Sequence, residues 1–220
     1  MKYWGWASDG ISKTNCNHMK GVNDMADYEK LTQNLERLGY HVAHFATAQE
    51  AADYLDSQID QTSASFGGSV TLKELDLYSR LSRHNRVVWH WEGGTLDEAV
   101  GTEVYITSAN GLAETGEIIN IDGTGNRVAA TLYGHKRVYF VVGSNKIAPD
   151  YDAALWRARN IASPKNAQRL GAKTPCAVKG DRCYNCQSPE RICRALVVLW
   201  EKPKSAERME IVLVDEPLGY

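Results

Sequence analysis

The stretch Val138-Tyr-Phe-Val-Val142 is a continuous apolar run near the middle of the chain. A short run of this kind, rich in β-branched residues, is typical of a central strand in a parallel sheet, because such a strand is covered on both faces. Patterns of helix and strand alternate before and after it. The sequence therefore predicts an α/β domain whose mostly parallel sheet is flanked by helices.

Periodicity and turn-forming residues predict the other elements. Thr47 and Glu50 have the spacing of a capping box, and Asp150 and Pro164 suit the first turns of two later helices. Helices are predicted over residues 24–38, 47–59, 71–75, 126–133, 150–161 and 164–171, and strands over 40–45, 63–66, 86–91, 103–107, 118–121, 138–142, 195–200 and 209–214. We expect the last two strands to form a hairpin, joined by a polar turn.

Composition limits the classes of function and partner. The 220 residues are 43% hydrophobic and carry a formal net charge of −2, with basic and acidic residues interspersed. Such a balance offers no broad basic face to a nucleic acid, so we expect no nucleic-acid partner. No apolar run approaches the roughly 18 residues of a membrane span, and residues 1–20 lack the apolar core of a signal peptide, so we expect a cytoplasmic protein without a membrane partner.

Four of the five cysteines lie within eighteen residues, at Cys176, Cys183, Cys186 and Cys193. Two thiolates separated by two residues can bind one tetrahedral centre while flanking turns bring in two more. Disulfides are the alternative, but an odd cysteine count in a chain without a signal peptide argues against them. Four thiolates without histidine suit zinc and an iron–sulfur cluster alike, and neither spacing rule is matched in full.

Two glycine-rich segments are candidates for binding an anion at the carboxyl ends of strands. The first contains Gly67, Gly68, Ser69 and Thr71, where glycines allow close approach and hydroxyls can donate. A simple strand-to-helix turn is the alternative for this pattern.

The second segment, residues 108–127, is dense in amides, carboxylates and glycines. Gly123, Thr124 and Gly125 could surround a phosphate or carboxylate that Arg127 clamps. The remaining ligand-binding candidates are Asn110, Asn120, Asn126, Asn145 and Lys146. Glu114, Glu117 and Asp122 are the candidates for acid–base catalysis, with Arg127 and Lys146 balancing substrate charge. The alternative is that residues 114–117 form a hairpin turn and that Asp122 or Asn126 caps a helix.

Several motifs in order resemble one family. Residues 106–130, 141–147, 159–162, 166–170 and 188–193 are similar to the lactate-utilisation (LUD) domain family, in particular to its stand-alone branch with four cysteines. The resemblance spans residues 24–220 and implies a fold similar to the glucosamine-6-phosphate deaminase, ribose-5-phosphate isomerase and CoA-transferase group. Family relatives are linked to lactate oxidation through iron–sulfur components, which favours a [4Fe–4S] cluster over zinc. A shorter stretch between Leu81 and Thr102 and a Trp-rich opening with Cys16 and His18 depart from the family pattern.

These observations predict the organisation of the chain and leave several functions open. We expect an N-terminal extension over residues 1–23 and an α/β domain over 24–220, with residues 173–194 as a cysteine-rich, metal-binding insertion. The first hypothesis is a protein of lactate or related small-carboxylate metabolism that binds an anionic small molecule. The alternatives are a non-catalytic accessory or electron-transfer subunit that docks to a redox partner protein, and an enzyme similar to sugar-phosphate isomerases with a structural zinc. The sequence does not indicate the oligomeric state.

Overall fold

Strand β7 (Arg137–Gly143) lies inside a six-stranded sheet, between β4 (Val104–Thr107) and β10 (Arg208–Val214). In the computed structural model, which describes residues 27–220, all pairings in this main sheet are parallel. Alternate side chains of β7 enter two hydrophobic cores, Tyr139 and Val141 on one face and Phe140 with its neighbours on the other. The predicted central strand and the α/β class are therefore confirmed.

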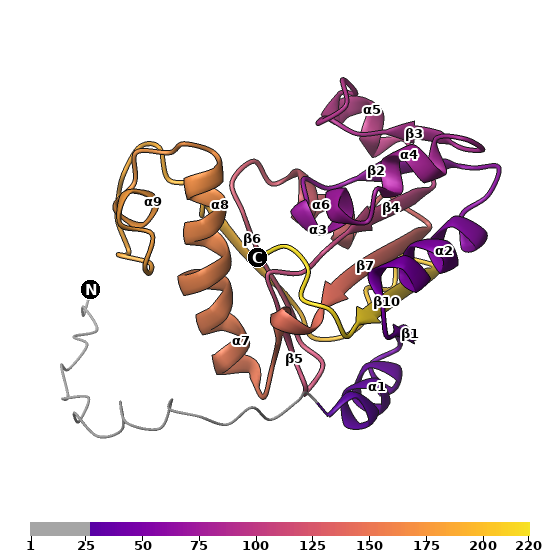
Figure 1. Cartoon of the computed structure of the whole chain (residues 1–220), viewed down its shortest axis with the longest axis horizontal. Coiled ribbons are helices and arrows are strands. Elements are labelled where there is room, and N and C mark those ends of the chain that lie inside the picture. The colour runs from indigo at the N-terminus through magenta and orange to yellow at the C-terminus, as the bar shows by residue number, and fades with distance from the viewer. Residues whose placement is uncertain (1–26) are drawn as a thin grey trace, which may run out of the picture.

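Helices α2 to α4 cover one face of the main sheet, and other helices together with a second sheet cover the other (Figure 1). The main sheet has the order β1-β10-β7-β4-β2-β3. Its other strands and its helices are β1 (His41–Phe45), β2 (Ser63–Phe66), β3 (Arg86–Val88), α1 (Tyr28–Arg37), α2 (Ala48–Gln58), α3 (Val70–Glu74), α4 (Leu77–Leu81), α5 (Leu96–Val100) and α6 (Asn126–Leu132). The core between the sheet and α2 to α4 contains Leu55, Leu72 and Leu81, whereas Leu31 and Leu35 of α1 pack on the opposite face. No described helix is both long and apolar enough to cross a membrane.

The second sheet has four strands in the order β8-β5-β6-β9. Its strands are β5 (Gly111–Ala113), β6 (Ile118–Asp122), β8 (Ile147–Ala148) and β9 (Ala195–Leu199). One face packs on the main domain and the other on a long helical segment made of α7 (Tyr151–Arg157), a π turn (Ala158–Ala162) and α8 (Ser163–Arg169). Helix α9 (Pro175–Lys179) and an irregular stretch lead from there to β9, beside α8 (Figure 1).

Three expectations about the elements are wrong. The last two strands do not form a hairpin, because β10 inserts between β1 and β7 while β9 pairs with β6 in the other sheet. The two helices expected over 150–161 and 164–171 are one continuous segment, in which the wider π turn accommodates Pro164, which has no N–H to donate. The strand expected over 86–91 ends at Val88. Residues 1–26, with the predicted extension, Cys16 and His18, lie outside the described part.

Two neighbouring segments of the chain cross from the main sheet to the second sheet. β4 and β7 pair in the main sheet, and the strands that follow them, β5 and β8, pair in parallel in the second sheet. Between the sheets these two chain segments are held together by Arg157 of α7. Its Nε donates to the carbonyl oxygen of Asn145 at 2.5 Å, and its Nη1 donates to that of Asn110 at 2.6 Å. One guanidinium therefore fixes both crossings, and it does so while only 7% exposed.

We predict that Arg157→Lys destabilises the chain, because an ammonium cannot donate from two separated atoms and would leave a buried carbonyl unpaired. The cost should be about 1–3 kcal/mol in the free energy of unfolding. Urea denaturation of the purified variant measures it. Arg159→Lys, at an exposed position of the same helical segment, is the control and should unfold like the parent chain. Equal stability of both variants would contradict the assigned role.

Candidate functional site

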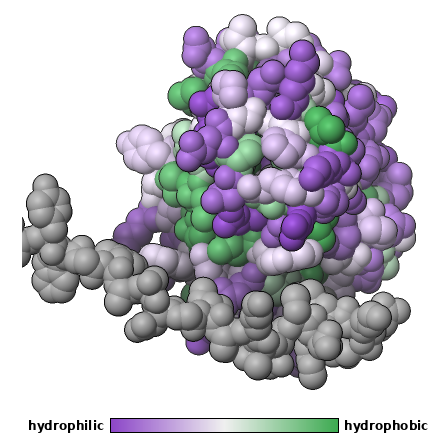
Figure 2. Space-filling view, turned by 90° about the vertical axis from the view of Figure 1, so that its left-hand side faces the viewer, coloured by the Kyte–Doolittle hydropathy of each residue, from purple (hydrophilic) through white to green (hydrophobic). Residues whose placement is uncertain are grey.

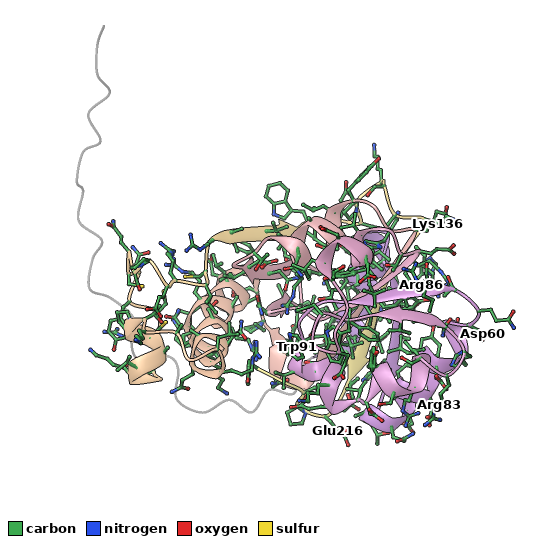
Figure 3. All side chains as sticks on the ribbon, turned by 90° about the horizontal axis from the view of Figure 1, so that it is seen from above. Asp60, Arg83, Arg86, Trp91, Lys136 and Glu216 are labelled. Carbon is green, nitrogen blue, oxygen red and sulfur yellow. The ribbon has the colours of Figure 1, made fainter. Side chains whose placement is uncertain are left out.

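A cavity of about 490 Å³ lies where the main sheet meets the second sheet. Residues within three positions after the ends of β2, β3, β4 and β7 line it, so it occupies the carboxyl edge of the parallel strands. Figure 3 places Trp91, which follows β3, toward the middle of the molecule, whereas Arg86 and Lys136, at or next to the amino ends of β3 and β7, lie at the far end. We call this space the basic cavity.

The lining of the basic cavity carries an excess of positive charge. Its basic side chains are Arg127, Lys146, Arg169, Arg191 and Arg194. Asp122 is the single carboxylate side chain among the described residues that line it. His90 also lines the wall, and its pKa is lowered, mainly by burial and further by Arg127 and Arg169. Such a wall favours an anionic ligand over a cation or an apolar molecule.

The first glycine segment borders this cavity through Gly68, Ser69 and Thr71. The carbonyl oxygen of Gly68 accepts a hydrogen bond from the Arg127 guanidinium. Ser69 caps α3 by accepting from the N–H of Leu72 at 3.5 Å. Gly67 does not line the cavity: a Cβ there would lie 2.7 Å from the hydroxyl oxygen of Tyr105, so packing against β4 explains the glycine.

The second segment contributes Asn110, Asp122, Gly123, Thr124, Asn126 and Arg127 to the lining. The Asp122 carboxylate accepts from the N–H groups of Thr124 at 3.1 Å and Val128 at 3.2 Å, which makes it a cap of α6. Gly123 packs on the cysteine segment, since a Cβ there would lie 2.6 Å from the carbonyl oxygen of Ile192. Gly125, with φ +94°, precedes α6 and does not line the cavity.

Four other predicted residues lie away from the basic cavity. Glu114 and Glu117 flank the turn between β5 and β6, where Glu114 contacts α1: its carbonyl oxygen accepts from the Asn34 amide at 2.7 Å. Asn120 is buried on β6, and Asn145 holds the tail after β10 by accepting from the N–H of Leu218 at 3.0 Å. The structure therefore separates Glu114 and Glu117 from Asp122, and no shared catalytic site forms from the three.

Lys146 lies at the base of the basic cavity and is only 3% exposed. Its Nζ donates to Thr71 Oγ1 at 2.6 Å and to Ser108 Oγ at 2.8 Å. Burial lowers its pKa to about 7, with further lowering from Arg157 and Arg127 and an opposing effect of Glu74. Near neutral pH the amine is therefore partly uncharged, unlike an ordinary lysine.

The four cysteines of the motif line a second cavity, of about 250 Å³, which we call the cysteine cavity. None of these four cysteines is in a disulfide. Hydrogen-bond donors lie near the sulfurs: the N–H of Asn185 is 3.4 Å from Cys183 Sγ, and Arg191 Nη2 is 3.5 Å from Cys193 Sγ. As arranged, no three His, Cys, Asp or Glu side chains in residues 27–220 are close enough to hold a metal ion, so binding one would require the sulfurs to move together.

The two cavities are neighbours. Arg191, Ile192 and Arg194 line both of them, as do Ile121 and Ser163. The segment that carries the cysteines thus also supplies two of the guanidiniums of the basic cavity.

Sequence reasoning missed part of this site. The sequence pattern places His90 and Trp91 in a strand and marks Asn166 and Arg169 only as part of the family resemblance, whereas all four line the basic cavity. Ser163, Asn166 and Leu170 recur at helical spacing, which is a signal that one face of α8 is a cavity wall. The Arg169 guanidinium lies 4.8 Å from the centre of the Trp91 ring, a cation–π contact that only the folded chain reveals.

Comparisons with known proteins give one family and one fold. Residues 28–214 match the family model described as the LUD domain. The structure is similar to the crystal structure of a DUF162 family protein from Deinococcus radiodurans, with a TM-score of 0.52 and 13% identity, over 85% of this chain and 95% of that one. Comparison with curated proteins gives no match.

We predict that Lys146 makes stability depend on pH. Unfolding returns its pKa from about 7 to 10.5, so between these values the unfolded chain binds more protons than the native chain. The free energy of unfolding of the parent chain, minus that of Lys146→Met, should therefore rise as pH increases through this window and level off outside it. Urea denaturation at several pH values measures the difference. A difference independent of pH would show that the buried amine titrates normally.

Proposed function

The chain belongs to the LUD domain family, and on that premise we propose that it binds a small anionic metabolite in the basic cavity and holds a [4Fe–4S] cluster at its four cysteines. The metabolite is a carboxylate or a phosphate ester, which fits a role in lactate or related small-carboxylate metabolism. The proposal rests on the two cavities themselves.

One observation carries the anion assignment: four guanidiniums and one buried amine surround a single cavity that has one carboxylate side chain among its described lining residues. That carboxylate, on Asp122, is already engaged in capping α6. An anionic ligand would therefore meet little opposing charge. Guanidiniums can bind a carboxylate or a phosphate through two parallel hydrogen bonds, so the cavity offers geometric selection as well as charge.

The cluster assignment is supported by the chemistry of the donors. Four thiol groups line one cavity, and no histidine or carboxylate side chain is among the described residues that line it. Hydrogen bonds to sulfur and nearby guanidiniums suit a site whose ligands are thiolates, and they would raise the potential of a cluster bound there. When bound, the cluster would supply one-electron transfer. Zinc remains the alternative, because the same four thiolates suit it.

The surface beside the cysteine cavity supports a further part of the proposal, a redox partner protein. Leu196 lines that cavity and is 48% exposed, and Trp200, directly after the same strand, is 73% exposed. Figure 2 shows apolar residues gathered among polar ones on the side of the molecule formed by α7 to α9. A partner that docked here would lie close to the cysteines.

We predict that bound anions stabilise the chain against heat and that Arg169→Gln weakens the binding of these anions. The assay is the rise in Tm with L-lactate, pyruvate, ribose 5-phosphate and inorganic phosphate, converted to a Kd. Loss of one charged hydrogen bond should raise the Kd by about tenfold. Arg83→Gln is the control, since Arg83 is exposed at the far end of the molecule (Figure 3), and it should bind like the parent chain. If no anion raises Tm, the cavity is not an anion site.

We also predict that protein purified without oxygen is brown, absorbs broadly near about 400 nm, and contains iron and sulfide. Cys183→Ser should lose most of the iron, because a serine hydroxyl is a poor ligand for a cluster. Cys16→Ser, which changes the one cysteine outside the motif, is the control and should retain it. Elemental analysis of the parent chain and both variants identifies the metal and its ligands. Stoichiometric zinc in a colourless protein would show that the cysteines hold a structural zinc ion and not a cluster. Unchanged metal content in Cys183→Ser would reject the site.

A further inference from the structure

Lys146 has an arrangement of hydrogen bonds that suits an uncharged amine. The Ser108 hydroxyl donates its single hydrogen to the carbonyl oxygen of Val141 at 2.6 Å, and the Thr71 hydroxyl donates to that of Leu218 at 3.2 Å. Each hydroxyl can therefore only accept from Lys146 Nζ, which lies 2.8 Å from the first and 2.6 Å from the second. Two acceptors match the two hydrogens of a neutral amine.

A charged amine would be less well accommodated at the same position. An ammonium has a third hydrogen, and within residues 27–220 no third acceptor and no carboxylate lies within bonding distance of Nζ. The nearby charges are those of Arg157, Arg127 and Glu74, of which the two arginines oppose a positive charge. The tail after β10 closes over the amine, since a Cβ on Gly219 would lie 3.4 Å from Nζ. The fourth tetrahedral position of Nζ is thus left for a lone pair, in a residue that lines the basic cavity.

We propose that Lys146 is a nucleophile that captures the carbonyl group of a small anion in the basic cavity as an imine. The proposal rests on the anion binding proposed above and adds the class of ligand: a ketone or aldehyde that also carries a carboxylate or a phosphate. The guanidiniums of the cavity hold the anionic group, and the amine meets the carbonyl carbon. Desolvation and neighbouring cations are the two effects that activate lysines for this chemistry.

The step is balanced without any oxidant or reductant. The lone pair of Nζ forms the N–C bond while the carbonyl π electrons move to oxygen. Both amine hydrogens then leave with that oxygen as water, and a C=N bond replaces the C=O bond. The result is a covalent, reversible adduct on one residue of the chain.

The test is reductive trapping on the purified full chain. Protein is incubated at pH 7 with sodium cyanoborohydride and either pyruvate or dihydroxyacetone phosphate, and each lysine is assayed by peptide mass spectrometry. An exposed lysine is uncharged to only about one part in 10³ at this pH, so Lys146 should be labelled on the order of a hundredfold faster than an ordinary lysine. Lys136, which is exposed, serves as the internal reference. The two probes distinguish a carboxylate-bearing from a phosphate-bearing carbonyl.

Labelling of Lys146 ahead of Lys136 with either probe supports the proposal, and equal or absent labelling with both probes overturns it. L-Lactate, which lacks a carbonyl, should give no adduct. The mapping is done on the parent chain, so the result does not depend on whether Lys146→Met folds. Thermal shifts measured on the same samples separate the two proposals: anion binding without an adduct rejects the nucleophile alone, whereas no binding and no adduct reject both.

Discussion

Arg157 is the contact on which the geometry of the site depends. Strands β4 and β7 pair in the main sheet, and the strands that follow them, β5 and β8, pair again in the second sheet. The Arg157 guanidinium donates to one carbonyl oxygen of each segment, at Asn110 and Asn145. It does this from a buried position, and burial lowers its pKa to about 10. Ser108 lies two residues before Asn110 and Lys146 directly follows Asn145, so the same contact sets the position of the buried amine.

The parts of the fold that depend on local patterns could be predicted from the sequence. The apolar run around Phe140 is a central parallel strand, Thr47 and Glu50 form a capping box, and Asp150 caps α7 through the N–H of Ala153. Each of these depends on residues a few positions apart. The placement of β10 between β1 and β7 does not depend on such local patterns. Two strands adjacent in sequence can pair with each other or with distant partners, and local periodicity is the same in both cases.

The candidate site, like the fold, could be predicted from the sequence only in part. The glycine segments at Gly68 and Gly123 follow strands, and the rule that ligands bind at the carboxyl ends of parallel strands brings them to one edge of the sheet. Arg169 reaches that edge only because the helical segment continues through the π turn before Pro164, which the sequence suggested as a break. The state of Lys146 could not be predicted at all, since it depends on burial and on the hydroxyl groups of Thr71 and Ser108 from other elements.

The basic cavity and the cysteine cavity share a wall, so a substitution in that wall changes both of them. Arg191 and Arg194 face both spaces, and the backbone of Ile192 leaves no room for a side chain at Gly123. Under the proposed function, a substitution that adapts the cysteine segment to a different metal centre would also change the shape and charge of the basic cavity. Natural selection on the residues of either cavity therefore acts on both cavities, and we expect the linings of the two cavities to change together in evolution.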